Sequence, residues 1–156
     1  MANYIKHVRF NLFLALPIIL GLGYYFLRPS YLLIITFAAV FSYSTLFMNP
    51  DLDVANQIKL FSIRGMLTFP FRSYAILFKH RGLSHNLILG SLTRIFWLAI
   101  WGIIIFWAIY KTFPTKISLY RYYQQYHSFI LYSLSAICLA DWCHLLLDSK
   151  VIKRLK

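Results

Sequence analysis

The sequence predicts an all-α integral membrane protein with four transmembrane helices and an interfacial segment between the second and the third. The chain of 156 residues is 60% hydrophobic and 19% aromatic, whereas soluble domains are roughly 45–50% apolar. Several uninterrupted apolar runs approach or exceed the ~20 residues that a helix needs to cross a bilayer. Most polar and charged residues fall between those runs. We therefore expect one membrane domain, residues 1–156.

The apolar runs define the expected spans, which are residues 11–27, 31–48, 87–110 and 128–147. The first run follows Lys6 and Arg9, as the apolar part of a signal sequence would. No small-x-small cleavage site comes after it, so we expect an uncleaved span. Pro29 lies in the turn before the second span, and Pro50 lies just after that span. Proline at these places indicates that the helices end there.

Two polar segments connect the later spans. Residues 54–79 mix basic and aromatic side chains, with Gly65 and Pro70 dividing them into short pieces. This composition is typical of segments that lie in the lipid headgroup layer. Residues 111–127 are polar and rich in tyrosine, and we expect them to form a loop.

The net charge of +12 comes from sixteen Lys and Arg residues against four acids. No base-reading motif accompanies this charge, so we expect anionic membrane lipids rather than nucleic acid as partners. With four spans, the N-terminus, residues 49–86 and the C-terminal tail share one side and carry eleven of the basic residues; four lie opposite. The positive-inside rule predicts that both termini lie in the cytoplasm.

The residues that can ligate a metal gather on this cytoplasmic side. The chain has no glutamate, and all four aspartates and four of its five histidines fall there; His127 alone falls on the other side. The gathered residues are His7, Asp51, Asp53, His80, His85, Asp141, His144 and Asp148.

Three of these residues share one face of the fourth span. At about 100° per residue, Asp148 lies within about 20° of Asp141, and His144 lies about 60° away. An ionised carboxylate inside the membrane costs several kcal/mol unless it is coordinated or paired. Arg94, about two turns inside the third span, is the alternative partner for Asp141.

The other candidates lie around two turns. Asp51 and Asp53 follow a proline, and a D-x-D turn can present both carboxylates to divalent ions. His80 and His85 would diverge by about 140° on a continuous helix, so their convergence needs the bend that Gly82 permits. Arg81 between them is a candidate clamp for phosphate or carboxylate.

Eight nitrogen and oxygen ligands are more than one metal ion needs. A structural zinc takes about four, so the set suits two ions, or one ion with a second shell of carboxylates. Imidazole with carboxylate and without thiolate favours zinc, manganese or iron. Cys138 and Cys143 form no C-x-x-C pair and lie on different helix faces, so we expect neither a zinc knuckle nor a disulfide between them.

These motifs resemble those of small bacterial membrane proteins described as metal-binding proteins or membrane-bound metal-dependent hydrolases. The shared pattern is an N-terminal histidine, a P-D-x-D turn, an H-R-G-x-[ST]-H box and a D-x-x-H-x-x-x-D helix. In this chain they are His7, residues 50–53, residues 80–85 and residues 141–148. The box carries Ser84 where many relatives have threonine. The resemblance implies metal binding and phosphoester hydrolysis, with Arg94 belonging to the site.

The leading hypothesis is a metal-dependent hydrolase acting on a phosphoester or phospholipid headgroup at the cytoplasmic membrane face. Asp51 or Asp148 would act as the base, while Arg81 and Arg94 would hold developing negative charge. The alternative is a non-catalytic metal-binding membrane protein, either a sensor or an assembly factor. Transport is disfavoured, because nothing polar near the outer ends of the spans matches Asp141 and Arg94.

Overall fold

The computed structural model describes residues 4–48, 65, 66, 68, 69, 71, 74 and 89–148, and the longer described segments are helical. The elements are α1 (Tyr4–Arg9), the π-helix η1 (Phe10–Ala15), α2 (Leu16–Leu27), α3 (Tyr31–Phe47), α6 (Leu89–Tyr110) and α7 (Lys116–Asp148). The prediction of an all-α fold is confirmed. The predicted Asp51, Asp53, His80, Arg81 and His85 lie outside the described residues.

The first three elements form one continuous helix with a widened middle. The Leu16 N–H bonds to the carbonyl of Asn11, five residues back, which is the π-helical spacing. Pro17 follows directly; it has no N–H, and its ring conflicts with the carbonyl four residues earlier in a regular α-helix. A wide turn before a proline relieves that conflict. The apolar helix runs over Ile5–Leu27 and contains the predicted span 11–27; it begins before that span because Lys6 and Arg9 lower the hydropathy of its first turns without ending the helix.

A tight turn joins α2 to α3. Arg28 adopts a left-handed conformation with φ 43°, and its N–H bonds to the Tyr24 carbonyl at 3.1 Å, which ends α2. Ser30 begins α3, since its carbonyl accepts the N–H groups of Leu33 and Ile34. With 17 residues, α3 is about 26 Å long and is the shortest of the four apolar helices predicted as spans.

The last two helices form a second hairpin. Helix α6 matches the predicted span 87–110 over its described residues. Lys111 ends it in a left-handed conformation with φ 56°, and the Thr115 hydroxyl accepts the N–H of Ser118 at 3.2 Å to cap α7. Helix α7 has 33 residues, so the expectation of a loop through residue 127 was wrong. The low hydropathy of residues 116–127 shows that they are polar, and polar residues can still form a helix.

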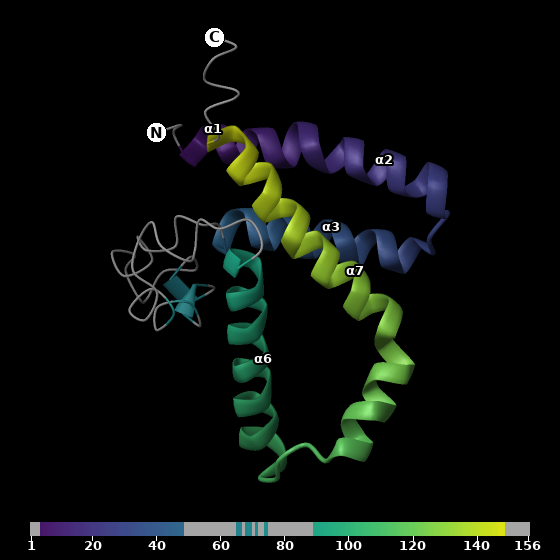
Figure 1. Ribbon diagram of the computed structural model, residues 1–156, viewed down its shortest axis with the longest axis vertical. Helices are drawn as coiled ribbons and strands as arrows, with labels where there is room; N and C mark the ends of the chain where they lie inside the picture. The colour runs from purple at the N-terminus through teal and green to yellow at the C-terminus, as the bar shows by residue number, and fades with distance from the viewer. Residues whose placement is uncertain are drawn as a thin grey trace.

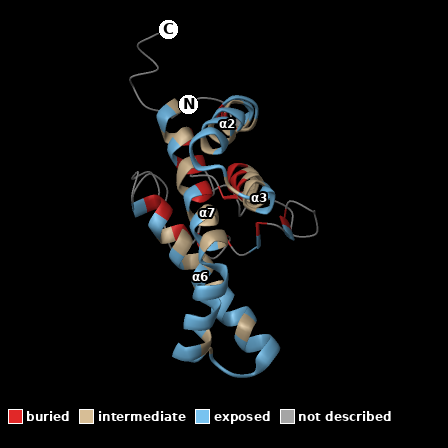
Figure 2. Cartoon of the chain, turned by 90° about the vertical axis from the view of Figure 1, so that its right-hand side faces the viewer, coloured by how far each residue is buried: buried red, intermediate tan, exposed pale blue. Residues whose placement is uncertain are grey.

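The helices converge at one end of the molecule. In Figure 1, α2 and α3 run across the view, α6 runs down from beside the end of α3, and α7 returns to finish next to α1. Buried residues concentrate where α1, α3 and α7 meet, whereas the distal parts of α6 and α7 are exposed (Figure 2). The main buried cluster consists of Ala15, Phe37, Phe41, Ala136 and Ala140.

Within the residues that the structure describes, three helices are long and apolar enough to cross a membrane, namely Ile5–Leu27, Leu89–Tyr110 and Lys116–Leu147, and α3 is a shorter apolar helix. Their outer surfaces carry exposed large apolar side chains, such as Leu22, Ile104 and Ile109. A soluble protein rarely exposes so large an apolar surface, whereas a bilayer favours it. These features indicate a multi-pass membrane protein.

Candidate metal centre

The first helix and α7 pack in an antiparallel register with a spacing of four residues on each helix. The His7 ring stacks on the His144 ring, and the Asn11 side chain bonds to the carbonyl of Ala140. One further step along, Ala15 and Ala136 lie in the same buried cluster. Small side chains at these positions let the helices approach closely.

The stacked histidines are the centre of the candidate site. Their ring centroids are 4.1 Å apart with an interplanar angle of 22°, and each residue is only 2% exposed. Each ring carries two nitrogens, and imidazole is the commonest metal ligand among protein side chains. The donor chemistry fits a divalent metal ion.

Asp141, one turn before His144, is held by two partners from α6. Its Oδ1 lies 2.5 Å from Arg94 Nη1, and its Oδ2 accepts a hydrogen bond from Ser91 Oγ at 2.8 Å. All three residues are at most 3% exposed. The structure thus shows the alternative partner that the sequence offered for Asp141. Arg94 compensates the carboxylate charge, and Ser91 binds its second oxygen.

Asn11 of the first helix, one turn after His7, makes hydrogen bonds to two other helices. Its Nδ2 donates to the Ala140 carbonyl at 3.1 Å and to Thr45 Oγ1 of α3 at 3.4 Å. Its own Oδ1 and the Ser44 Oγ are buried without a hydrogen-bond partner among the described residues. Buried oxygens of this kind call for a bound water or ion, and this supports the fit to a polar ligand at this depth.

Sequence reasoning missed Asn11 and Ser91. Both carried a signal: Asn11 is four residues after His7, and Ser91 is three residues before Arg94, so each shares a helix face with a residue already identified. A polar side chain buried in an apolar span is costly unless it is bonded. That cost was a reason to include Asn11 and Ser91 among the candidate site residues.

The remaining predicted ligands are placed only in part. Asp148 ends α7 one turn beyond His144, and its side chain lies outside the described part of the structure. Within the described residues, no group of three or more His, Cys, Asp or Glu side chains could hold a metal. Residues 49–88, between the end of α3 and the start of α6, carry five of the predicted site residues, and both helix ends lie on the same side of the view as α1 (Figure 1).

Of the other titratable side chains, Cys138 lies beside Ser91 and Asp141, whereas His127 lies apart from this centre. Cys138 and Cys143 are free, partly buried thiols, as expected. His127 is exposed near the start of α7, with its Nδ1 3.1 Å from the Gln124 carbonyl. It does not join the cluster.

Comparison with known proteins assigns the chain to a family. No curated protein and no solved structure matches it. One family model matches residues 5–156, which include every described helix from Ile5 onward. Since the match covers nearly the whole sequence, the chain belongs to the DUF2227 family of uncharacterized metal-binding proteins.

Proposed function

We propose that this membrane protein binds one or two divalent metal ions beside the buried His7–His144 pair and uses them in hydrolysis at the cytoplasmic face of the bacterial inner membrane. The substrate class is a phosphoester or a phospholipid headgroup. The observation that carries the proposal is the stack of two imidazoles from the first and last helices, 4.1 Å apart and buried. Such a pair is costly inside a membrane protein unless it serves a site.

Within this proposal, the ligands come from two groups of residues. His7 and His144 are the described members. The others are proposed from the sequence pattern and are Asp51, Asp53, His80, His85 and Asp148. Asp141 has both oxygens engaged by Arg94 and Ser91. It therefore suits an outer role, holding α6 against α7 next to the ligands.

The family description supports metal binding, with zinc the first choice and manganese or iron the next. When bound, such an ion supplies a Lewis acid and an activated water. For the chain itself, Asp51 or Asp148 would accept a proton. Because Arg94 is paired with Asp141, Arg81 is the residue that would bind an anionic substrate.

A second candidate is a non-catalytic metal-binding sensor or assembly factor. The Arg94–Asp141 pair favours it, because this arginine, one turn of α7 away from His144 through Asp141, is buried and paired with a carboxylate. A hydrolase acting on phosphate needs a cation directed at substrate. In the described part of the chain, Arg94 does not have that orientation.

The test is metal analysis and an activity assay on the detergent-purified protein. Elemental analysis should find stoichiometric metal in the wild type and in His127→Phe, and a loss of metal in His144→Phe. Both substitutions change a histidine of α7 to phenylalanine, but only His144 is buried against His7. Equal metal in the two variants would rule out the histidine pair as a ligand. Turnover of phosphodiester or phospholipid by the wild type supports the hydrolase; bound metal without turnover supports the second candidate.

A further inference from the structure

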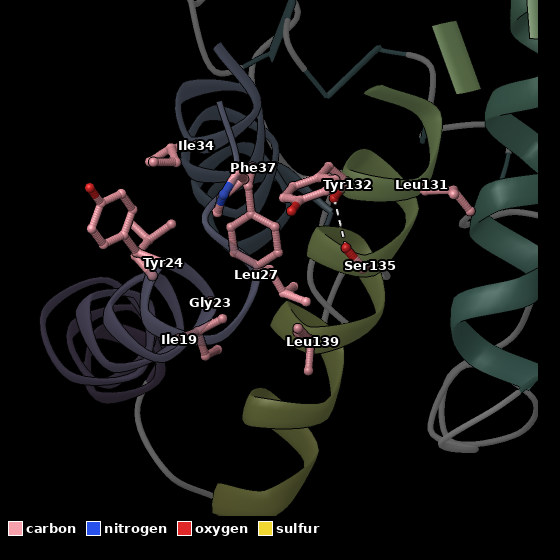
Figure 3. A pocket seen from close by; sticks show the side chains of 12 residues that line it. Ile19, Gly23, Tyr24, Leu27, Ile34, Phe37, Leu131, Tyr132, Ser135 and Leu139 are labelled. Atoms are coloured by element: carbon pink, nitrogen blue, oxygen red, sulfur yellow. Dashed lines mark hydrogen bonds between the residues drawn. The ribbon is translucent and has the colours of Figure 1, made fainter. Parts of the chain in front are cut away.

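A cavity of about 420 Å³ lies between α2, α3 and α7, beyond the small-residue contact of Ala15 and Ala136. Figure 3 shows side chains from all three helices around it. Its walls are almost entirely apolar, and Ile19, Phe37 and Leu139 are among them. Ser135 has one of the few polar groups there, and its hydroxyl already donates to the backbone carbonyl of Tyr132 at 2.9 Å.

We propose that this cavity binds one acyl chain of a membrane phospholipid, whose phosphate is held at Arg28. Helices α2 and α7 belong to apolar spans, so the surroundings of the cavity are hydrocarbon rather than water. Apolar walls of this kind do not hold water, and leaving the space unfilled would lose dispersion contacts with these walls. If a methylene fills about the ~30 Å³ of a water molecule, the volume accepts on the order of ten methylenes.

The turn between α2 and α3 supplies the charge that selects a phospholipid. Arg28 lies between Leu27 and Pro29, which both line the cavity, and its side chain is exposed. A guanidinium at this rim matches the geometry of a phosphate group. Exposed Tyr25 and Tyr31 flank the turn; tyrosine at such positions is typical of the headgroup level of a bilayer. The turn and the cavity together match a lipid's charged head and apolar tail.

Two glycines of α2 provide a matched pair of variants. A Cβ added at Gly23, which lines the cavity, meets nothing within 4 Å, and the same holds for Gly21, which does not line it. Both Gly→Leu changes favour a helix equally, so both variants should fold. Gly23→Leu fills the cavity, whereas Gly21→Leu extends into the exposed surface.

The experiment is native mass spectrometry of detergent-purified protein, with bound phospholipid as the readout and the melting temperature as the check on folding. Wild type and Gly21→Leu should retain one phospholipid, and Gly23→Leu should lose it. Arg28→Gln should weaken retention of an added phospholipid about fivefold while leaving retention of an added fatty alcohol unchanged. Equal retention in the two leucine variants would overturn the acyl site. Unchanged phospholipid retention in Arg28→Gln would overturn the phosphate assignment.

Discussion

The buried ion pair between α6 and α7 makes a quantitative prediction. Arg94→Met should destabilise the protein, because among the described residues it leaves the buried Asp141 carboxylate with Ser91 as its remaining hydrogen-bond partner. Asp141→Leu should be comparably harmful, since it removes the carboxylate that pairs with the buried Arg94 guanidinium. The double variant Arg94→Met/Asp141→Leu removes both charges and puts apolar side chains in their place.

The magnitude follows from burial and distance. The charged atoms approach to 2.5 Å at side chains that are 1% and 2% exposed. At about 4 Å between charge centres and an effective dielectric constant near 20, the attraction is about 4 kcal/mol. Removing one partner of such a pair costs about 3–5 kcal/mol. Removing both charged side chains should lower the free energy of unfolding by less than either single change does. The remaining loss of about 1–3 kcal/mol comes from the Ser91 hydroxyl, which no longer has the Asp141 carboxylate as its acceptor.

The assay is reversible unfolding in mixed micelles, which gives the free energy of unfolding for the wild type, both single variants and the double variant. Metal content of the folded double variant is a second readout, and we expect it to remain near the wild-type level. The pair is not coupled as the geometry requires if each single variant lowers the free energy of unfolding by less than about 1 kcal/mol. The same holds if the double variant lowers it by the sum of the two single effects. Loss of metal from a well-folded double variant would make Asp141 a ligand.

Three further predictions concern the helix contacts and the metal. Asn11→Leu should cost about 1 kcal/mol of unfolding free energy through its lost bonds to Ala140 and Thr45; Phe13→Leu, which changes an exposed residue of the same π-helix, is the control and should be neutral. Ala136→Leu should cost about 1–3 kcal/mol, because Ala136 is fully buried, and an unchanged melting temperature would mean that the packing there is loose. Treating the metal-bound protein with a chelator should lower its free energy of unfolding by about 2.7 kcal/mol if free metal was at 100 times Kd. A thermal scan showing no drop in melting temperature would mean that metal binding does not stabilise the fold.

The fold was predictable where a single physical requirement decides it. A helix that crosses a bilayer must be long and apolar, so hydropathy located α6 to within two residues of its described start. The same measure failed at the start of α1, where basic residues hide the helix, and over residues 116–127 of α7, where tyrosines and glutamines form a helix that is not apolar. Hydropathy reports the surroundings of a segment, and helix formation is a separate property.

The contacts around the candidate site could not be predicted from the sequence. Charge bias and helix periodicity predict that His7, Asp141 and His144 lie on one side of the membrane, and the structure stacks His7 on His144. Which face of the first helix meets α7 depends on the wide turn before Pro17, and no periodicity rule for a regular helix contains that turn. The sequence offered both Arg94 and a metal ion as partners for Asp141. Deciding between them requires knowing how α6 packs against α7, and composition does not predict that packing.

The contact between Asn11 and Ala140 also bears on how the protein is made. The two residues are 129 positions apart in the chain. At 5–20 residues per second, roughly ten seconds of translation separate them. For most of that interval the Asn11 amide has the Thr45 hydroxyl as an acceptor but not yet the Ala140 carbonyl. The polar contacts between the two helices therefore form last, after α7 is inserted, and a chain that stalls before α7 cannot complete them.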